Sequence, residues 1–458
     1  MAISSKTLPG EATRRVPIRT YEAALKYLRS LTDYEQMRRV RYNVDTFSLT
    51  RMRSLLKKLQ DPHKNLRCVH IAGTKGKGST ATMLAAMLQA NGYKVGLYTS
   101  PHLLDIRERI QINSEPISPG ALTKYINKVA QVIKKNDKDK PTFFEILTAI
   151  GFSYFADEKV DIAVIEAGLG GRLDSTNVIK PMVVGFSSIS RDHMHQLGDT
   201  IESIAGEKAG ILKRGVPAVS APQVPEAKDV LKKAAKKVDA PLLFTGDQID
   251  FSYRFESTRE SGPQTRICLT TARSRFEHLP VPLLGEHQAI NCGLALALLD
   301  QLKAQGMKID DSAAIEGLNQ VYLPGRMEII HTNPRILIDG AHNAASIEAL
   351  IQAVGQYIPY DSMVVIFGCG IDKDIPGMLE QLMRGADKVI FTRANHPRAA
   401  DPAELANKYE MRSDRAAQVA DNVADAIRIA YNAISREDLI CITGSFYLIG
   451  EAKRLLTK

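Results

Sequence analysis

The sequence predicts a soluble α/β protein of two or three domains, built on largely parallel sheets. Short runs of Val and Ile alternate with segments of helical periodicity, and several runs end directly in Gly, Asp, Glu or Ser. This alternation is typical of parallel strands joined by helices. With 458 residues, the chain also exceeds the size of one ordinary domain. Its content of 44% hydrophobic and 24% charged residues is typical of globular proteins.

The expected strands form two groups separated by Pro324-Gly325. The first group covers 67–72, 95–99, 160–165 and 182–186, and the second covers 336–338, 364–367, 389–392 and 439–442. Helices are expected over 21–31, 49–59, 81–89 and 286–302, and the turn-rich stretch 248–271 predicts a small β excursion. Since a Pro-Gly pair is typical of a turn or hinge, we expect a flexible tail over 1–20 and domains over 21–324 and 325–458.

Composition and charge argue against several classes of partner. The net charge of +9 is spread along the chain, and no dense basic block with interleaved aromatic residues predicts a nucleic-acid surface. No apolar run is long enough to span a bilayer, so we expect no membrane partner. Five scattered cysteines show no metal-ligand spacing, which favours free thiols in a reducing compartment and a cytoplasmic location.

A glycine-rich loop follows the first expected strand, where the chain reads GTKGKGST (73–80). Glycines let backbone N–H groups point at phosphate oxygens, and the start of the following helix adds partial positive charge. Lys77 is expected to reach the terminal phosphates of a nucleotide and Ser79 to contact Mg²⁺. The strict Walker pattern is absent, because Ile71 replaces its first Gly and Gly78 separates the Lys from the Ser. The alternative is a glycine-rich turn with a surface lysine.

Two further candidates follow expected strands. Glu166 directly follows the apolar run 160–165. Burying a carboxylate costs on the order of several kcal/mol of folding free energy unless it is paired or bound to metal. Beside a triphosphate, Mg²⁺ is its natural partner, and an ion pair with Arg172 is the alternative. His193 follows the run 182–186, although a lone histidine is more often a packed or surface residue than a ligand.

Eleven motifs span nearly the whole chain in one order. They read GTKGKGS (73–79), TSPHL (99–103), TFFE (142–145), EAGLGGRLDSTN (166–177), DH (192–193), LGDTIESIAGEKAGI (197–211), GEHQAIN (285–291), LPGR (323–326), DGAHN (339–343), GIDKD (370–374) and TGSFYL (443–448). Together they resemble the folylpolyglutamate synthase/dihydrofolate synthase family, a branch of the ATP-dependent Mur-type ligases. The resemblance implies a P-loop domain with a mainly parallel sheet, followed by a smaller Rossmann-like α/β domain, with ATP in the cleft between them.

The resemblance also assigns roles to residues. The expected ATP-binding residues are Gly73, Thr74, Lys75, Gly76, Lys77, Gly78, Ser79, Asn291, Arg326 and Asp339. The expected Mg²⁺ ligands are Ser100, Glu166 and His193, and the catalytic residues are Lys77, Lys208, Asp339 and His342. His342 and Ser445 match positions associated with glutamate, whereas Thr142, Phe143, Phe144, Leu173 and Asp174 match the pterin or folate side. Core packing is the alternative for the two phenylalanines.

Lys208 resembles a lysine that CO₂ carbamylates in this family. Carbamylation would turn a cation into an anion able to support a second Mg²⁺; the alternative is an ordinary lysine paired with Glu207.

The sequence departs from the family pattern at four places. Lys75 and Ser188 replace common asparagines, Ala344 replaces a frequent proline, and His396 is an extra residue before Pro397-Arg398-Ala399.

The resemblance implies a two-step ligation in a monomeric enzyme. ATP would phosphorylate a substrate carboxylate, and the L-glutamate amine would then displace phosphate from the acyl phosphate. Dihydropteroate, reduced folates or both stay open as acceptors, as does dependence on a monovalent cation. A muramyl-peptide ligase is one alternative, although only 72 residues precede Gly73 where those ligases carry a sugar-binding domain. The other is a P-loop NTPase that releases phosphate without ligation.

Overall fold

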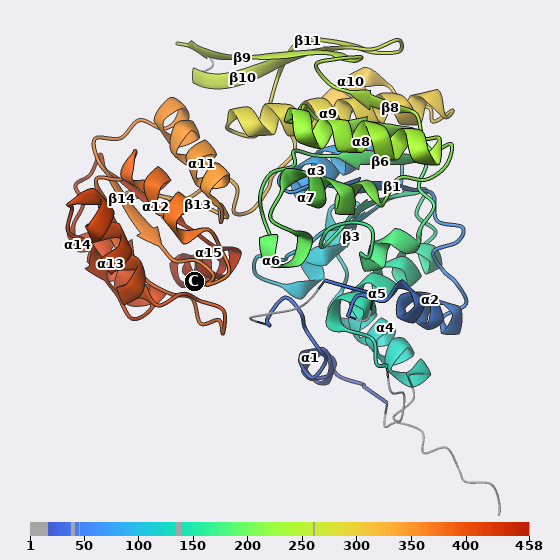
Figure 1. Ribbon diagram of the computed structural model, residues 1–458, viewed down its shortest axis with the longest axis horizontal. Coiled ribbons are helices and arrows are strands. Elements are labelled where there is room, and N and C mark those ends of the chain that lie inside the picture. Colours follow the sequence, from blue (N-terminus) through green and yellow to red (C-terminus); the bar gives the residue numbers. More distant parts are fainter. Residues whose placement is uncertain (1–16, 38–41, 45, 134–138, 260–261, 458) are drawn as a thin grey trace, which may run out of the picture.

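Two open sheets organise the chain, one before Pro324 and one after it (Figure 1). The computed structural model describes residues 17–37, 42–44, 46–133, 139–259 and 262–457. Residues 1–16 of the tail predicted over 1–20 therefore lie outside the described residues. The α/β class with mainly parallel sheets is confirmed. The domain limits at 324 and 325 stay a prediction.

The first sheet has the strand order β4-β3-β2-β5-β1-β6-β7-β8. Its strands are β1 (Cys68–Ala72), β2 (Val95–Tyr98), β3 (Ile110–Ile112), β4 (Glu115–Pro116), β5 (Ile162–Glu166), β6 (Val183–Phe186), β7 (Ala218–Ser220) and β8 (Leu242–Phe244). Near one edge of the described sheet, β3 runs antiparallel to both of its neighbours, β2 and β4. The central strands β1, β5 and β6 are buried throughout, as expected for parallel strands covered on both faces.

Helices cover both faces of this sheet. One face packs against α3 (Lys77–Ala90), α9 (Glu286–Ala304) and α10 (Asp311–Asn319). The opposite face packs against α2 (Leu49–Lys58), α4 (Pro119–Val132), α5 (Phe143–Asp157), α7 (Ile201–Ala209) and α8 (Pro225–Val238), with α1 (Tyr21–Arg29) beside α4. Short helical turns η1 (Ile106–Arg109), η2 (Ser175–Val178) and α6 (Met194–Leu197) lie in the connections. No helix of the described chain is both long and apolar enough to cross a bilayer.

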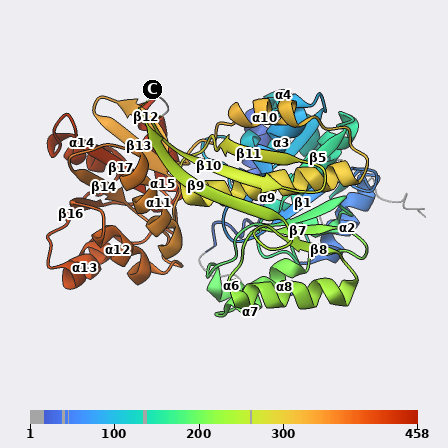
Figure 2. The same ribbon diagram turned by 90° about the horizontal axis from the view of Figure 1, so that it is seen from above.

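The predicted β excursion is an antiparallel sheet of three strands, β9 (Asp250–Thr258), β10 (Gly262–Thr270) and β11 (Arg275–Pro280). Figure 2 shows this sheet lying over α9 and extending toward the C-terminal half. Its far end contacts Tyr357, whose ring meets Phe255 edge-to-face at 5.3 Å and whose hydroxyl forms a hydrogen bond with Thr265. This three-stranded sheet therefore makes direct contact with the C-terminal half of the chain.

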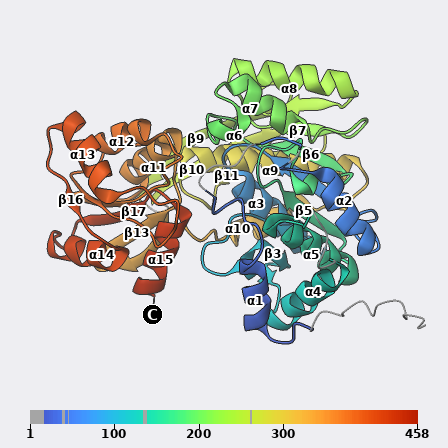
Figure 3. The ribbon, with the colours of Figure 1, turned by 60° about the horizontal axis from the view of Figure 1, so that its bottom comes forward.

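The second sheet has the order β12-β13-β17-β14-β15-β16. Its strands are β12 (Glu328–Thr332), β13 (Arg335–Asp339), β14 (Met363–Phe367), β15 (Lys388–Phe391), β16 (Gln418–Val419) and β17 (Leu439–Thr443). Helices α11 (Ala344–Tyr357), α12 (Ile375–Met383) and α13 (Pro402–Ser413) pack on one face, and α14 (Val423–Asn432) and α15 (Phe446–Leu456) on the other (Figure 3). All strands except β12 run parallel.

Candidate active site

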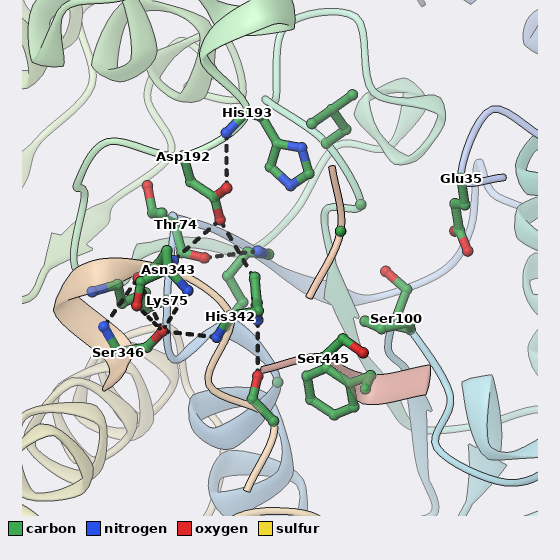
Figure 4. A pocket seen from close by; sticks show the side chains of 18 of the residues that line it. Glu35, Thr74, Lys75, Ser100, Asp192, His193, His342, Asn343, Ser346 and Ser445 are labelled. Carbon is green, nitrogen blue, oxygen red and sulfur yellow. Dashed lines mark hydrogen bonds and ion pairs between the residues drawn. The ribbon is translucent and has the colours of Figure 1, made fainter. Parts of the chain in front are cut away.

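The carboxyl ends of the parallel strands in both sheets face one cleft. The glycine-rich loop follows β1, Ser100 follows β2, and Glu166 is the last residue of β5. In the second sheet, Asp339 ends β13 and Ser445 follows β17. Because ligands of open α/β sheets bind beyond these ends, this is the expected position of a substrate site. Figure 4 shows Asp192 pointing toward His342 and Asn343, with Ser100 and Ser445 farther along the cleft.

Nearly all residues predicted for the site line this cleft. Those that do are Gly73, Thr74, Lys75, Gly76, Lys77, Gly78, Ser79, Ser100, Thr142, Phe144, Glu166, Asp174, His193, Lys208, Asn291, Arg326, Asp339, His342 and Ser445. Two predicted residues lie behind its wall instead. Phe143 is buried with its ring 5.5 Å from the Arg109 guanidinium, and Leu173 is also buried. Core packing therefore describes Phe143, whereas its neighbour Phe144 faces the cavity.

The glycine-rich loop presents free backbone donors to the cleft. Helix α3 begins directly at Lys77, four residues earlier than predicted, and no side chain in the described ranges caps its first turn. Its first N–H groups are therefore available to an anion. Gly76 has a φ of 80°, and a Cβ there would collide with the Asn291 side chain, so this position requires glycine.

Lys75 places a second ammonium group in the cleft, in addition to that of Lys77. Among the described residues, the Lys75 side chain has neither a hydrogen-bond acceptor nor an ion-pair partner. Burial lowers its pKa to about 8, against the opposing effect of Asp192 and Glu348. A desolvated cation without a partner favours an anionic ligand.

Glu166 is a buried carboxylate with little compensation from the protein. It accepts one hydrogen bond from the Ser100 N–H at 3.0 Å, and the Lys77 ammonium lies 3.9 Å away. Burial raises its pKa, whereas Lys77 acts in the opposite direction. The alternative ion pair with Arg172 is wrong, because Arg172 pairs with Glu207 at 2.8 Å. An oxygen-rich site with an undercompensated carboxylate fits a divalent cation.

His193 can supply a neutral nitrogen ligand in the same cleft. It directly precedes α6, and its backbone is in the left-handed region with a φ of 51°. Burial lowers its pKa to about 3, so the imidazole is uncharged at neutral pH. In the described part of the chain, no cluster of three or more His, Cys, Asp and Glu side chains could hold a metal by itself. A metal here would therefore also need ligands such as the Ser100 hydroxyl and nucleotide phosphates.

Lys208 is buried beneath the glycine-rich loop. Its ammonium donates to the Gly73 carbonyl at 2.8 Å. Burial and then the charge of Lys77 lower its pKa to about 7, so much of the amine is uncharged at neutral pH. The alternative pairing with Glu207 is wrong, since Glu207 is held by Arg172. Only an uncharged amine can add to CO₂, so this environment fits the predicted carbamylation.

On the opposite wall, Asp339 and Arg326 are held in place from within the second domain. The Asp339 carboxylate accepts from the N–H groups of Met327 at 2.9 Å and Ala341 at 2.8 Å. Arg326 stacks over the Phe446 ring at 4.6 Å. Both side chains line the cleft, and these contacts orient them.

Asp192 connects the two walls. Lys373 donates to its carboxylate at 2.9 Å, and His342 Nε2 and Asn343 Nδ2 lie 3.5 Å and 3.4 Å from it. Burial raises the pKa of Asp192, but the Lys373 ammonium and the contact with His342 act more strongly and hold it well below its usual value. The motifs that contain Asp192 and Lys373 do not predict this contact, because residue spacing carries no information on which domains meet.

A second connection between the domains was missed entirely. Arg109 holds both oxygens of Glu35 at 2.7 and 2.8 Å, and Arg398 donates to the Glu35 carbonyl at 2.6 Å. Glu35 and its neighbours Asp33 and Tyr34 thereby line the cleft. The only available signal was the family-like Arg398, since the segment around Glu35 has no motif.

Family models match both halves of the chain. The model described as Mur ligase middle domain matches residues 71–299, and that described as Mur ligase, glutamate ligase domain, matches residues 325–446. A dihydrofolate synthase/folylpolyglutamate synthase of Bacillus subtilis is 36% identical over 414 residues, covering 89% of this chain and 94% of the relative. The Mycobacterium tuberculosis enzyme of the same name is 35% identical, covering 97% and 96%.

Solved structures agree with this relationship. Mycobacterium tuberculosis folylpolyglutamate synthase complexed with ADP has a TM-score of 0.86 at 33% identity, covering 96% of this chain and 99% of that chain. Escherichia coli FolC in complex with DHPP and ADP has a TM-score of 0.83 at 28% identity, covering 97% and 98%.

The fold and the cleft thus define an ATP-dependent ligase of the Mur type. Within that class, the chain belongs to the folylpolyglutamate synthase/dihydrofolate synthase family, which confirms the predicted resemblance. The relatives' names give no support to the muramyl-peptide ligase or to the NTPase without ligation.

Proposed function

We propose that this enzyme uses ATP to activate the carboxylate of dihydropteroate or a reduced folate and then joins that carboxylate to L-glutamate. The observation that supports this most is the composition of the cleft. One wall carries the glycine-rich loop and Glu166, and the other carries Asp339, His342 and Ser445. A nucleotide and an amino acid bound on opposite walls would have their reacting groups side by side.

In the first step, the acceptor carboxylate attacks the γ-phosphorus of ATP, and ADP leaves. Lys77 and the free N–H groups at the start of α3 would stabilise the charge on the phosphate oxygens. Asn291 on α9 would hold the nucleotide from the first domain, and Arg326 and Asp339 would hold it from the second domain. Ser100, Glu166 and His193 would hold Mg²⁺, which supplies charge neutralisation to the phosphates when bound.

In the second step, the glutamate amine attacks the acyl carbon and phosphate leaves. His342 and Ser445 would orient glutamate, and Phe144 with Asp174 would contact the acceptor from the opposite wall. Closing the domains over the cleft would exclude water, which would otherwise hydrolyse the acyl phosphate. The contacts of Asp192 with Lys373 and His342 fit a closed arrangement.

A carbamylated Lys208 would place a negative charge close to the Gly73 carbonyl and the phosphates, where a second Mg²⁺ would balance it.

We further propose a cytoplasmic monomer. Size-exclusion chromatography with light scattering tests the monomer, and a dimer mass would contradict it.

The decisive experiment measures ADP formation with ATP, Mg²⁺ and L-glutamate, adding dihydropteroate or tetrahydrofolate in parallel reactions. We expect ADP release to depend on both glutamate and at least one acceptor, with equimolar formation of the glutamylated product. ADP release that is indifferent to both acceptors would falsify the proposed ligation. Comparing the two acceptors also decides between dihydrofolate synthesis, tail extension and both.

A further inference from the structure

His70 is a buried histidine that is not among the residues lining the cleft. It lies in the middle of β1, with a fully buried side chain. Alternation along the strand turns Val69 and Ile71 toward α3, so His70 projects to the opposite face of the sheet. There its Nε2 lies 2.8 Å from Thr176 Oγ1, whereas its Nδ1 is buried and has no hydrogen-bond partner among the described residues.

Thr176 extends this contact to Asp174. Its hydroxyl is fully buried and donates to Asp174 Oδ1 at 2.5 Å. A hydroxyl has only one proton, so the hydrogen bond between Thr176 and His70 requires a proton on the imidazole Nε2. Burial lowers the pKa of His70 to about 3, which leaves Nδ1 unprotonated and the ring neutral at physiological pH.

Asp174 in turn holds the loop that forms the acceptor side of the cleft. Its Oδ2 accepts from the Leu169 N–H at 2.8 Å, and its Oδ1 accepts from the Thr176 N–H at 3.0 Å. Asp174 and Leu169 both line the cleft. The hydrogen bonds therefore run from His70 through Thr176 to the carboxylate and on to the loop.

We propose that His70 is a positioning residue for the acceptor: its Nε2–H donates to Thr176, which fixes the Asp174 carboxylate and the loop over 168–174 against the bound acceptor. This inference rests on the proposed function, since it assigns a cause to the geometry of that site. The imidazole itself does not touch substrate.

A matched pair of variants tests the contribution of the hydrogen bond donated by the His70 Nε2–H. His70→Gln retains an N–H at the position of Nε2, whereas His70→Met has a similar length without a donor. Losing one buried hydrogen bond should raise the acceptor KM about tenfold in His70→Met and leave the ATP KM within about twofold. His70→Gln should keep the acceptor KM within about threefold of the wild type. Thr176→Val, which removes both hydroxyl contacts, should match His70→Met.

A purely structural role would give a different pattern. Equal acceptor KM values in the Gln and Met variants, or an ATP KM that rises with the acceptor KM, would overturn the proposal. Cys68→Ala, on the same face of β1 and away from the cleft, controls for loss of packing. Both KM values should stay unchanged there.

One measurement does not depend on turnover or on variants that fold. Nitrogen-15 NMR of histidine-labelled wild-type protein should show His70 as the neutral Nε2–H tautomer. An Nδ1–H tautomer would contradict the direction of the hydrogen bonds and sink the proposal. If wild-type protein instead showed no ligation with either acceptor, the proposed function would fail while the tautomer result still stood.

Discussion

The Lys373 ammonium donates to Asp192 Oδ1 at 2.9 Å, and this nearly buried ion pair joins the C-terminal domain to the residue preceding His193. The same carboxylate faces His342 and Asn343, which also belong to the C-terminal domain. A single acidic side chain thus links the expected metal side of the cleft to the expected glutamate side.

We expect Lys373→Met to reduce kcat by about 10–100-fold, because small displacements of reacting groups slow catalysis strongly. The coupling energy between Asp192→Asn and Lys373→Met should be about 0.5–3 kcal/mol in a double-mutant cycle of unfolding free energies. Lys388→Met, at an exposed position of β15 far from the cleft, serves as the control. Additive effects of the two variants would show that the pair does not couple the domains.

The lowered pKa of Asp192 predicts a dependence of stability on pH. Since the folded protein holds this carboxyl ionised below the usual pKa of about 4, the stabilisation is present above pH 4 and is lost as the pH falls through the folded pKa. Asp192→Asn should therefore lose less unfolding free energy than the wild type between pH 5 and pH 3. Chemical denaturation at each pH measures this, and parallel curves for the two proteins would refute it.

Lys77→Ala should lower kcat by about 10²–10³, as is typical when one charge contact in a transition state is removed. The variant should remain folded, because the only polar partners of the Lys77 ammonium within the described chain are the Thr74 carbonyl and, more distantly, Glu166. Circular dichroism checks the fold and steady-state ADP release measures the loss. Lys237→Ala on the exposed side of α8 is the matched control, and unchanged turnover in Lys77→Ala would remove the assignment.

Lys75→Asn, which restores the residue common in the family, should weaken nucleotide binding about 3–10-fold at pH 7, in line with the loss of one charged contact. Because the pKa of Lys75 in the free protein is about 8, the ammonium loses its proton as the pH rises above 8. The advantage of the wild type should therefore shrink between pH 7 and pH 9. Calorimetric titration with a non-hydrolysable ATP analogue tests this; a constant ratio of affinities across the range would speak against it.

Lys208 predicts a dependence on dissolved CO₂. Removing CO₂ and bicarbonate from the buffer should lower activity several-fold, and added bicarbonate should restore it, because the uncharged amine adds CO₂ reversibly. Lys208→Ala should be about 10² less active or worse and should not respond to bicarbonate. Carbon-13 NMR after exposure to labelled bicarbonate should show a carbamate signal that is missing from the variant. A wild-type enzyme without that signal would leave Lys208 as an ordinary buried amine.

Much of the fold was predictable because local patterns agreed with the tertiary structure. The eight strands that the sequence predicted individually are all present, with ends that differ by at most two residues. Buried parallel strands are continuous runs of apolar residues, so hydrophobicity alone identifies them. The start of α3 was placed four residues late, because a helix that begins inside a glycine-rich loop has low helical propensity there.

The sequence by itself determined the α/β class, the glycine-rich loop and the polar residues that follow each strand, because these depend on short-range periodicity and on backbone chemistry. The tertiary structure alone decided which of those residues share a cleft, that Phe143 packs behind its wall while Phe144 faces it, and that Arg172 takes Glu207 instead of Glu166. It also decided the contacts of Asp192 with Lys373 and of Glu35 with Arg398. These pairs join residues that are 181 and 363 positions apart in the sequence. Such partners come within hydrogen-bonding distance only once the domains have packed together, so their burial and electrostatic interaction cannot be predicted from sequence spacing.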